Sequence, residues 1–156
     1  AVNLGVLKNG EVFYAEIIEG EHPLRMSDHV GAKAPFHSTA VGKAIAAHLP
    51  ERDVQELIRA HGLPAVTPRT IQDPEVFRSE LAGVRRDGYA VDDEENVLGA
   101  RCVAAPIFNM HGDVVGAISL SGPIQRLSDA HMRQIALDVR QAAVHISEKL
   151  GYMRSQ

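Results

Sequence analysis

The chain has 156 residues, 45% of them hydrophobic, and this is enough to bury the core of one domain without disulfides. Its formal net charge of −4 argues against a nucleic-acid surface, which is normally a basic patch, and its single cysteine excludes an internal disulfide. Because it shows neither an apolar run near the ~20 residues of a membrane helix nor a signal-peptide pattern, we expect a cytoplasmic protein without a membrane partner.

The chain begins with the pattern of an antiparallel hairpin. Val2, Leu4 and Val6 alternate before Asn9-Gly10, which is the strongest short hairpin signal, and residues 11–19 form the expected return strand.

The next segment leads into a short helix. Residues 24–26 are compatible with another short strand, and residues 31–35 are typical of a loop. Ser38 is the expected N-cap of a helix that ends at Pro50. Four residues of this helix recur at helical spacing: Val41, Ala44, Ile45 and His48.

Two further helices are predicted in the middle of the chain. The first ends at Gly62, and the second begins at Asp73-Pro74; an irregular link of residues 63–72 connects them. Their apolar positions are Val54, Leu57 and Ile58 in the first helix and Phe77, Leu81 and Val84 in the second.

A second hairpin and a long helix complete the prediction. Residues 100–108 and 113–121 resemble strands, and residues 109–112 form the expected turn. Ser128 is the expected start of the helix and Gly151 its end. The inward stripe of this helix is Met132, Ile135, Val139, Ala142, Ile146 and Leu150. Hairpins separated by helices predict an α+β domain with a mainly antiparallel sheet.

Strand alternation suggests a binding site on the second hairpin. If the turn spans residues 109–112, Phe108 pairs with Asp113 and Cys102 lies opposite Ser119. One face then holds Cys102, Ala104, Ala117, Ser119 and Ser121, and the other holds Val103, Ile107, Val114, Ile118 and Leu120. Small residues leave room, and hydroxyl and thiol groups can orient a ligand. The alternative is that the two serines face water, as on any sheet with one solvated side.

Three sequence blocks resemble the IclR-type bacterial transcription regulators, in that family's order. They are HSTAVGKAIAAHLP at residues 37–50, GYAVDDEENVLGARCVAAPIFN at residues 88–109 and SLSGPIQRLS at residues 119–128. The match covers the family's C-terminal effector-binding domain and implies that residues 1–156 form one such domain. It also implies a GAF-like fold, with a central, mainly antiparallel sheet flanked by helices.

The resemblance further implies where an effector binds. In the family, small carboxylates such as glyoxylate or pyruvate contact backbone amides that correspond to Ala40 and Val41. Side-chain contacts correspond to Asp92, Cys102, Ser119 and Ser121, and all four carry a suitable group here. Some relatives have a glycine where this chain has Ala40, which narrows the space beside the carboxylate.

The carboxylate of Asp92 would repel an anionic ligand, so its place at this site needs a reason. It becomes useful if the effector carries a hydroxyl or hydrate group that donates to it, which favours 2-oxo or hydroxy acids. Its neighbours Asp93 and Glu94 are more typical of an exposed acidic stretch. Glu95 matches the family pattern but is expected to hold the loop, for example by accepting backbone N–H bonds.

The resemblance implies a domain of a larger regulator. Family members carry an N-terminal winged helix-turn-helix, which is absent from this chain, and they act on promoters as dimers or tetramers. We therefore expect DNA contact only through that missing domain, and self-association of this one.

Two other functional classes remain as alternatives for this chain. Cys102 with His37 could act as nucleophile and base in a small-molecule enzyme, but no oxyanion motif or orienting group accompanies them. A purely structural oligomerisation domain is the other alternative. The histidines lack ligand pairs at metal-binding spacing, so no metal, cofactor or catalytic residue is expected.

Overall fold

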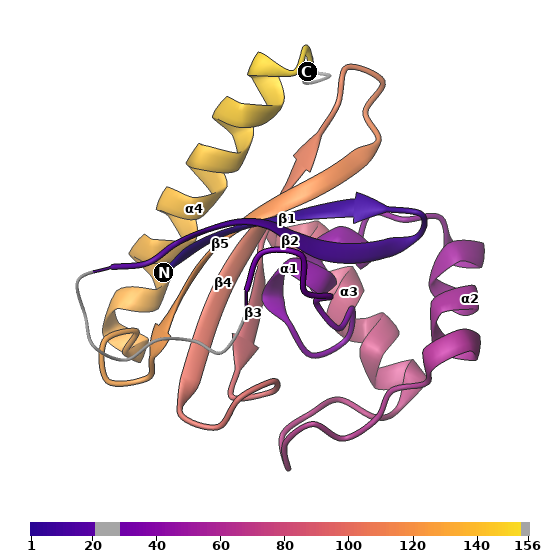
Figure 1. The fold of residues 1–156 in the computed structure, drawn as a ribbon, viewed down its shortest axis with the longest axis vertical. Helices are drawn as coiled ribbons and strands as arrows, with labels where there is room; N and C mark the ends of the chain where they lie inside the picture. Colours follow the sequence, from indigo (N-terminus) through magenta and orange to yellow (C-terminus); the bar gives the residue numbers. More distant parts are fainter. Residues whose placement is uncertain (21–28, 154–156) are drawn as a thin grey trace.

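A five-stranded antiparallel sheet forms the centre of the molecule (Figure 1). The computed structural model describes residues 1–20 and 29–153. The strands are β1 (Val2–Lys8), β2 (Glu11–Ile18), β3 (Ala90–Asp93), β4 (Ala100–Phe108) and β5 (Val114–Pro123), in the order β2-β1-β5-β4-β3. The helices are α1 (Ala40–Ala46), α2 (Glu51–His61), α3 (Pro74–Asp87) and α4 (Asp129–Lys149).

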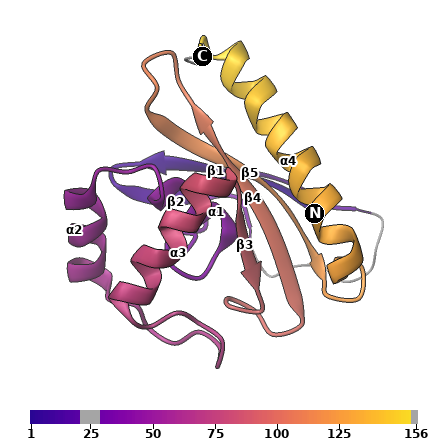
Figure 2. The same ribbon diagram turned by 180° about the vertical axis from the view of Figure 1, so that it is seen from behind.

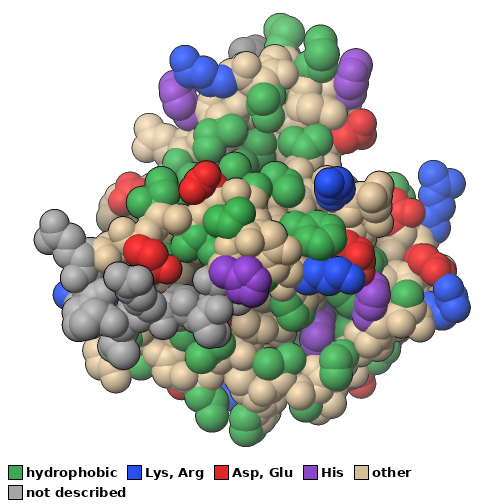
Figure 3. Space-filling view, in the orientation of Figure 1, with side chains coloured by type: hydrophobic (Ala, Val, Ile, Leu, Met, Phe, Trp, Pro, Cys, Tyr) green, Lys and Arg blue, Asp and Glu red, His purple; other side chains and the backbone are tan. Residues whose placement is uncertain are grey.

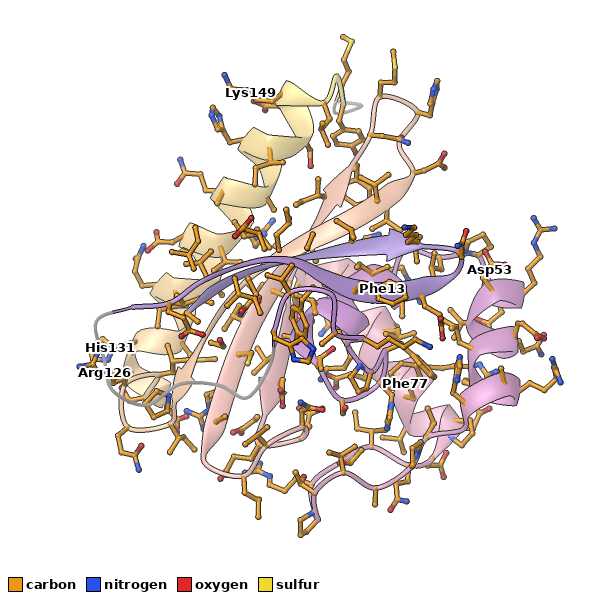
Figure 4. All side chains as sticks on the ribbon, viewed as in Figure 1. Phe13, Asp53, Phe77, Arg126, His131 and Lys149 are labelled. Carbon is orange, nitrogen blue, oxygen red and sulfur yellow. The ribbon has the colours of Figure 1, made fainter. Side chains whose placement is uncertain are left out.

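The helices cover both faces of this sheet. α1, α2 and α3 lie on one side, with α2 farthest from the strands, and α4 crosses the opposite side (Figures 1 and 2). Phe77 of α3 lies in the core between the sheet and α1, α2 and α3 (Figure 4). Its ring packs edge-on against that of Phe36, with 5.6 Å between the ring centroids. On the other side, Ala136 and Val139 of α4 pack against Val103 of β4. The α+β architecture expected from the sequence is therefore confirmed.

Most element ends follow their local signals. Asn9 and Gly10 turn the first hairpin with positive φ angles of 52° and 78°. α2 ends at Gly62, and α3 begins after Asp73, whose carboxylate accepts from the amides of Glu75 and Val76. Caps of this kind provide hydrogen-bond partners for backbone groups that would otherwise be unpaired at a helix end.

The start of α1 differs from the prediction. Thr39 is the N-cap, and its Oγ1 accepts from the amide of Gly42 at 3.0 Å. Ser38 instead donates to Oδ1 of Asn96 at 2.7 Å. The expected cap at Ser38 is therefore wrong by one residue, because a tertiary partner holds its hydroxyl. The helix also ends at Ala46, before the expected limit of Pro50.

The register of the second hairpin also differs. Cys102 pairs with Ser121 and Ala104 with Ser119, so the predicted pairing of Cys102 with Ser119 is wrong. A bulge and a longer turn cause the two-residue shift: Ile107 pairs with Gly116, but Phe108 pairs with Val114. Because side chains alternate with a period of two, this shift leaves Cys102, Ser119 and Ser121 on the predicted face.

The bulge moves one residue to the other face. Val115 is the extra residue on β5, and Val114 consequently packs in the core beneath α1. Its predicted place on the α4 side is wrong. In α4, Val139 is buried as predicted, and Met132, Ile135 and Ile146 pack against the same core. The other two predicted positions differ: Leu150 is 48% exposed, and Ala143 rather than Ala142 lies in the core.

Two short strands need separate mention, one observed and one expected. The short edge strand β3 was not predicted; it pairs only with β4 and consists of four residues. The compatible strand at residues 24–26 lies outside the described part of the chain. Within that part, no helix is long and apolar enough to cross a bilayer.

Candidate functional site

One small cavity lies between the start of α1 and the sheet. Its lining includes all six residues expected at the effector site: Ala40, Val41, Asp92, Cys102, Ser119 and Ser121. Four others complete it: Asn3, Tyr14, Thr39 and Asn96. The structure thus brings together residues from β1, β2, β3, β4, β5 and the segments around α1 and β3.

The sheet side of this cavity carries two buried hydroxyl groups. Ser119 and Ser121 are only 3% and 5% exposed, which contradicts the alternative that they face water. Asn3 of β1 donates through Nδ2 to both serine oxygens, at 3.0 Å each. Sequence reasoning missed Asn3, because 116 residues separate it from Ser119 and only the pairing of β1 with β5 joins them.

The helix side of the cavity offers backbone donors. Thr39 Oγ1 accepts from Gly42, which leaves the amides of Ala40 and Val41 as the other two of the first helical turn. Both residues are buried, and no acceptor within the described residues pairs with either amide. The partial positive charge at a helix start favours an anion.

Asp92 closes the cavity at the end of β3. It is 3% exposed, and its Oδ1 accepts from the amide of Glu95 at 2.8 Å and from that of Asn96 at 3.3 Å. Burial raises the pKa of Asp92 to about 7, and the nearby charge of Glu95 adds to this, while the backbone hydrogen bonds and Lys43 oppose it. Both the protonated and the ionised form are therefore populated near neutral pH.

A buried lysine holds the loop that follows Asp92. Lys43 of α1 is fully buried, and its Nζ donates to Glu95 Oε1 at 2.8 Å, to Glu80 Oε1 at 3.2 Å and to the carbonyl of Val91 at 2.5 Å. Glu95 also accepts from the amide of Asp93 through Oε2, as expected for a residue that holds the loop. Sequence reasoning missed Lys43, although a single cation among apolar helix residues was a signal for a buried ion pair.

The cavity is small in this structure. Its volume is about 10 Å³, which is roughly the space that one water molecule needs. An acid of two or more carbons can therefore enter only if the cavity widens.

A larger cavity lies elsewhere on the α1 side of the sheet. It has a volume of about 260 Å³ and is bordered by the turn of the first hairpin, α1 and α2. Most of its lining is apolar, and its Glu11 is already paired with Lys33 at 3.2 Å and with His61 at 3.4 Å. The groups of Lys33 and His61 that could donate to a ligand here therefore already face Glu11, whereas two buried serine hydroxyls and the start of α1 border the small cavity.

His37 and Cys102 do not share a site. His37 borders the larger cavity, and its Nε2 contacts the carbonyl oxygen of Pro64 at 2.8 Å, whereas Cys102 borders the smaller one. Because a nucleophile and its base must lie within hydrogen-bond reach, the hypothetical Cys102–His37 pair gains no support. Within residues 1–20 and 29–153, no group of three His, Cys, Asp or Glu side chains could hold a metal ion.

The family model described as the C-terminal region of the bacterial transcriptional regulator IclR matches residues 1–148. The transcriptional repressor IclR of Escherichia coli is 39% identical over 155 residues, which are 98% of this chain and 57% of that protein. The regulator XynR of the same species is 37% identical, over 96% of this chain and 60% of its own length. The chain thus spans little more than half the length of these relatives.

Solved structures agree with these sequence matches. The Thermotoga maritima IclR structure has a TM-score of 0.92 and 37% identity, covering 97% of this chain and 61% of that one. The C-terminal domain of E. coli KdgR has a TM-score of 0.85 and 30% identity, covering 97% of this chain and 87% of that one.

Proposed function

The chain belongs to the IclR family of bacterial transcriptional regulators, matching their C-terminal region, and from this premise we propose that it senses a small carboxylate metabolite. The effector is a 2-oxo or hydroxy acid that binds in the cavity between α1 and the sheet. Binding favours one arrangement of the complete regulator over another and thereby changes its affinity for DNA. DNA is contacted by an N-terminal winged helix-turn-helix outside this chain.

One observation carries the proposal: buried hydrogen-bond donors converge on a single cavity. Ala40 and Val41, whose amides lack an acceptor among the described residues, border it from α1, and the buried Ser119 and Ser121 border it from β5. A carboxylate satisfies several such donors at once, and bonds to a charged acceptor are stronger than neutral ones. Cys102 adds a weakly polar side chain to the same wall.

Asp92 fits this ligand in either ionisation state. When ionised, it accepts a hydrogen bond from a hydroxyl or hydrate group of the effector. When protonated, it donates to an effector oxygen and no longer repels the anion. A pKa of about 7 makes both forms available.

Isothermal titration calorimetry with acids of two to six carbons tests the site. At least one 2-oxo or hydroxy acid is expected to bind and to raise the melting temperature, because a ligand specific for the folded state stabilises it. Ser119→Ala, Ser121→Ala and Asp92→Ala should each weaken binding by about 10- to 150-fold, the equivalent of ~1.5–3 kcal/mol for a bond to a charged group. Cys102→Ser should have a milder effect.

Ser79→Ala is the matched control, because Ser79 is exposed on α3 and does not line the cavity. If the best acid binds all four site variants as tightly as the wild type, the site assignment is wrong. If no acid binds, the domain is better explained as a structural oligomerisation module. If the wild type turned over a small molecule and Cys102→Ala abolished that activity, the domain would be better explained as an enzyme.

A further inference from the structure

Asn3 joins β1 to the two serines of the candidate site. The residue is only 7% exposed, and it lines the cavity. Asn3 pairs directly with Ser119 across the β1–β5 ladder, and its Nδ2 lies 3.0 Å from Ser119 Oγ and 3.0 Å from Ser121 Oγ. One amide group therefore uses both of its N–H bonds on two hydroxyls of the same strand.

These two bonds determine where the serine protons can point. An amide nitrogen has two hydrogens and no acceptor capacity, so each serine oxygen must accept and its own hydrogen must point elsewhere. Within the described residues, neither hydroxyl donates to a protein acceptor. Both serines also border the cavity, so its interior is the direction that remains for their hydrogens.

We propose that Asn3 is a positioning residue that turns the Ser119 and Ser121 hydroxyls into a preset pair of donors. The proposal rests on the proposed effector site and deepens it. The pair selects ligands that present acceptor oxygens to β5 and disfavours those that present only N–H or O–H donors. Donors that are already oriented need not reorganise when an anion binds, which strengthens its binding.

The neighbouring amide makes the role of Asn3 specific. Asn96 lines the same cavity, but its Oδ1 already accepts from Ser38 Oγ at 2.7 Å. An aspartate at position 96 therefore keeps the present acceptor, whereas an aspartate at position 3 reverses the bonds to both serines. The two substitutions add the same charge to the same cavity and differ in what they do to the hydroxyl protons.

The test titrates pyruvate into the wild type, Asn3→Asp and Asn96→Asp by calorimetry at pH 7.5 and pH 5. At pH 7.5, Asn3→Asp should weaken pyruvate binding at least about tenfold more than Asn96→Asp, because it removes two donors besides adding charge. At pH 5, relative to the wild type, the loss in Asn3→Asp should shrink, since burial raises the pKa of a carboxyl group at this position and its protonated form again has one O–H to donate. Equal losses in the two variants at both pH values would overturn the proposal.

Neutron crystallography of the ligand-free wild-type domain tests the orientation without any effector. Deuterons of the Asn3 amide should point at Ser119 and Ser121, and the serine deuterons should point into the cavity. An amide turned so that Oδ1 accepts from the serines would overturn the proposal, even if acids bind. Failure of the wild type to bind pyruvate or any other acid would instead contradict the proposed function, and the deuteron positions would still decide the role of Asn3.

Discussion

Asp92 shows how burial at a single residue sets a property of the whole domain. Its carboxyl group is nearly inaccessible, and its pKa is raised to about 7 chiefly because burial disfavours the charged form. The charge of Lys43 opposes this rise in pKa, but Lys43 is engaged by Glu95 and Glu80 and does not cancel the effect of burial. Folding therefore favours the protonated form of Asp92.

Asp92 should make the free energy of unfolding depend on pH. Its pKa rises from 3.8 to about 7 on folding, so between these pH values the folded state holds a proton that the unfolded state has released. The stabilisation is complete below about pH 4 and is lost as the pH rises through 7, at up to about 1.4 kcal/mol per pH unit. Urea unfolding between pH 5 and 8 measures this slope.

The contribution of Asp92 to this slope can be isolated by substitution. Asp92→Asn should flatten the pH dependence and stabilise the domain above pH 7, because an amide has no charge to bury. Asp53→Asn is the control, since Asp53 is exposed on α2 and its substitution should leave the slope unchanged. An unchanged slope in Asp92→Asn would show that other groups cause the pH dependence.

At the scale of elements, α1 depends on close contact with the segment before it. A Cβ atom built on Gly42 would overlap the carbonyl oxygen of Pro35 and lie 2.6 Å from Cα of Phe36. These are backbone atoms, so a side chain at position 42 would displace the start of α1, which borders the cavity. Gly83 on α3 differs, because its nearest neighbour would be the flexible guanidinium of Arg86 at 3.4 Å.

The two glycines should respond in opposite directions to alanine. Gly42→Ala should lower the free energy of unfolding by about 1–3 kcal/mol, the usual cost of overpacking. Gly83→Ala should raise it by up to about 1 kcal/mol, because alanine favours helix. Urea titration of both variants measures the difference, and equal effects would mean that the backbone before α1 yields to an added methyl group.

At the scale of the whole molecule, the described residues form no continuous basic patch on the face drawn in Figure 3. On the face in Figure 3, Lys and Arg side chains lie apart, among acidic and hydrophobic ones. The sequence offers the apolar segment of residues 61–66 as a surface for self-association. Val66 of this segment is 48% exposed, but Leu63 is only 8% exposed and belongs to the core, so Leu63 is not available to a partner.

Self-association is expected through surfaces outside the Cys102 cavity. An interface of standard size normally holds at ~100 μM, because it buries roughly 1,600 Å² in total. Sedimentation equilibrium at that concentration should therefore give a dimer or tetramer. A single species near the monomer mass of 16.9 kDa would contradict the expectation.

Local signals in the sequence determined most of the architecture. A few adjacent residues determine the Asn9-Gly10 turn, the Asp73 cap and the end of α2 at Gly62. These features can therefore be predicted from the sequence without knowledge of the fold. The prediction of which side chains of the second hairpin share a face was correct for Cys102, Ser119 and Ser121 although the predicted register was wrong. An error of two residues preserves the alternation of side chains between the two faces. Family resemblance supplied the positions on α1 and β3 that periodicity alone does not select.

Only the tertiary structure decided how the site is assembled. Asn3 meets Ser119 and Ser121 through the pairing of β1 with β5, and Lys43 meets Glu95 across 52 residues of sequence. The bulge at Val115 sets the register of β5 against β4, and the close packing at Gly42 holds the start of α1 against the segment before it. These features arise from contacts between segments that lie far apart in the sequence, and neither segment alone predicts the other. The same kind of contact determines the size of the cavity and the burial that raises the pKa of Asp92.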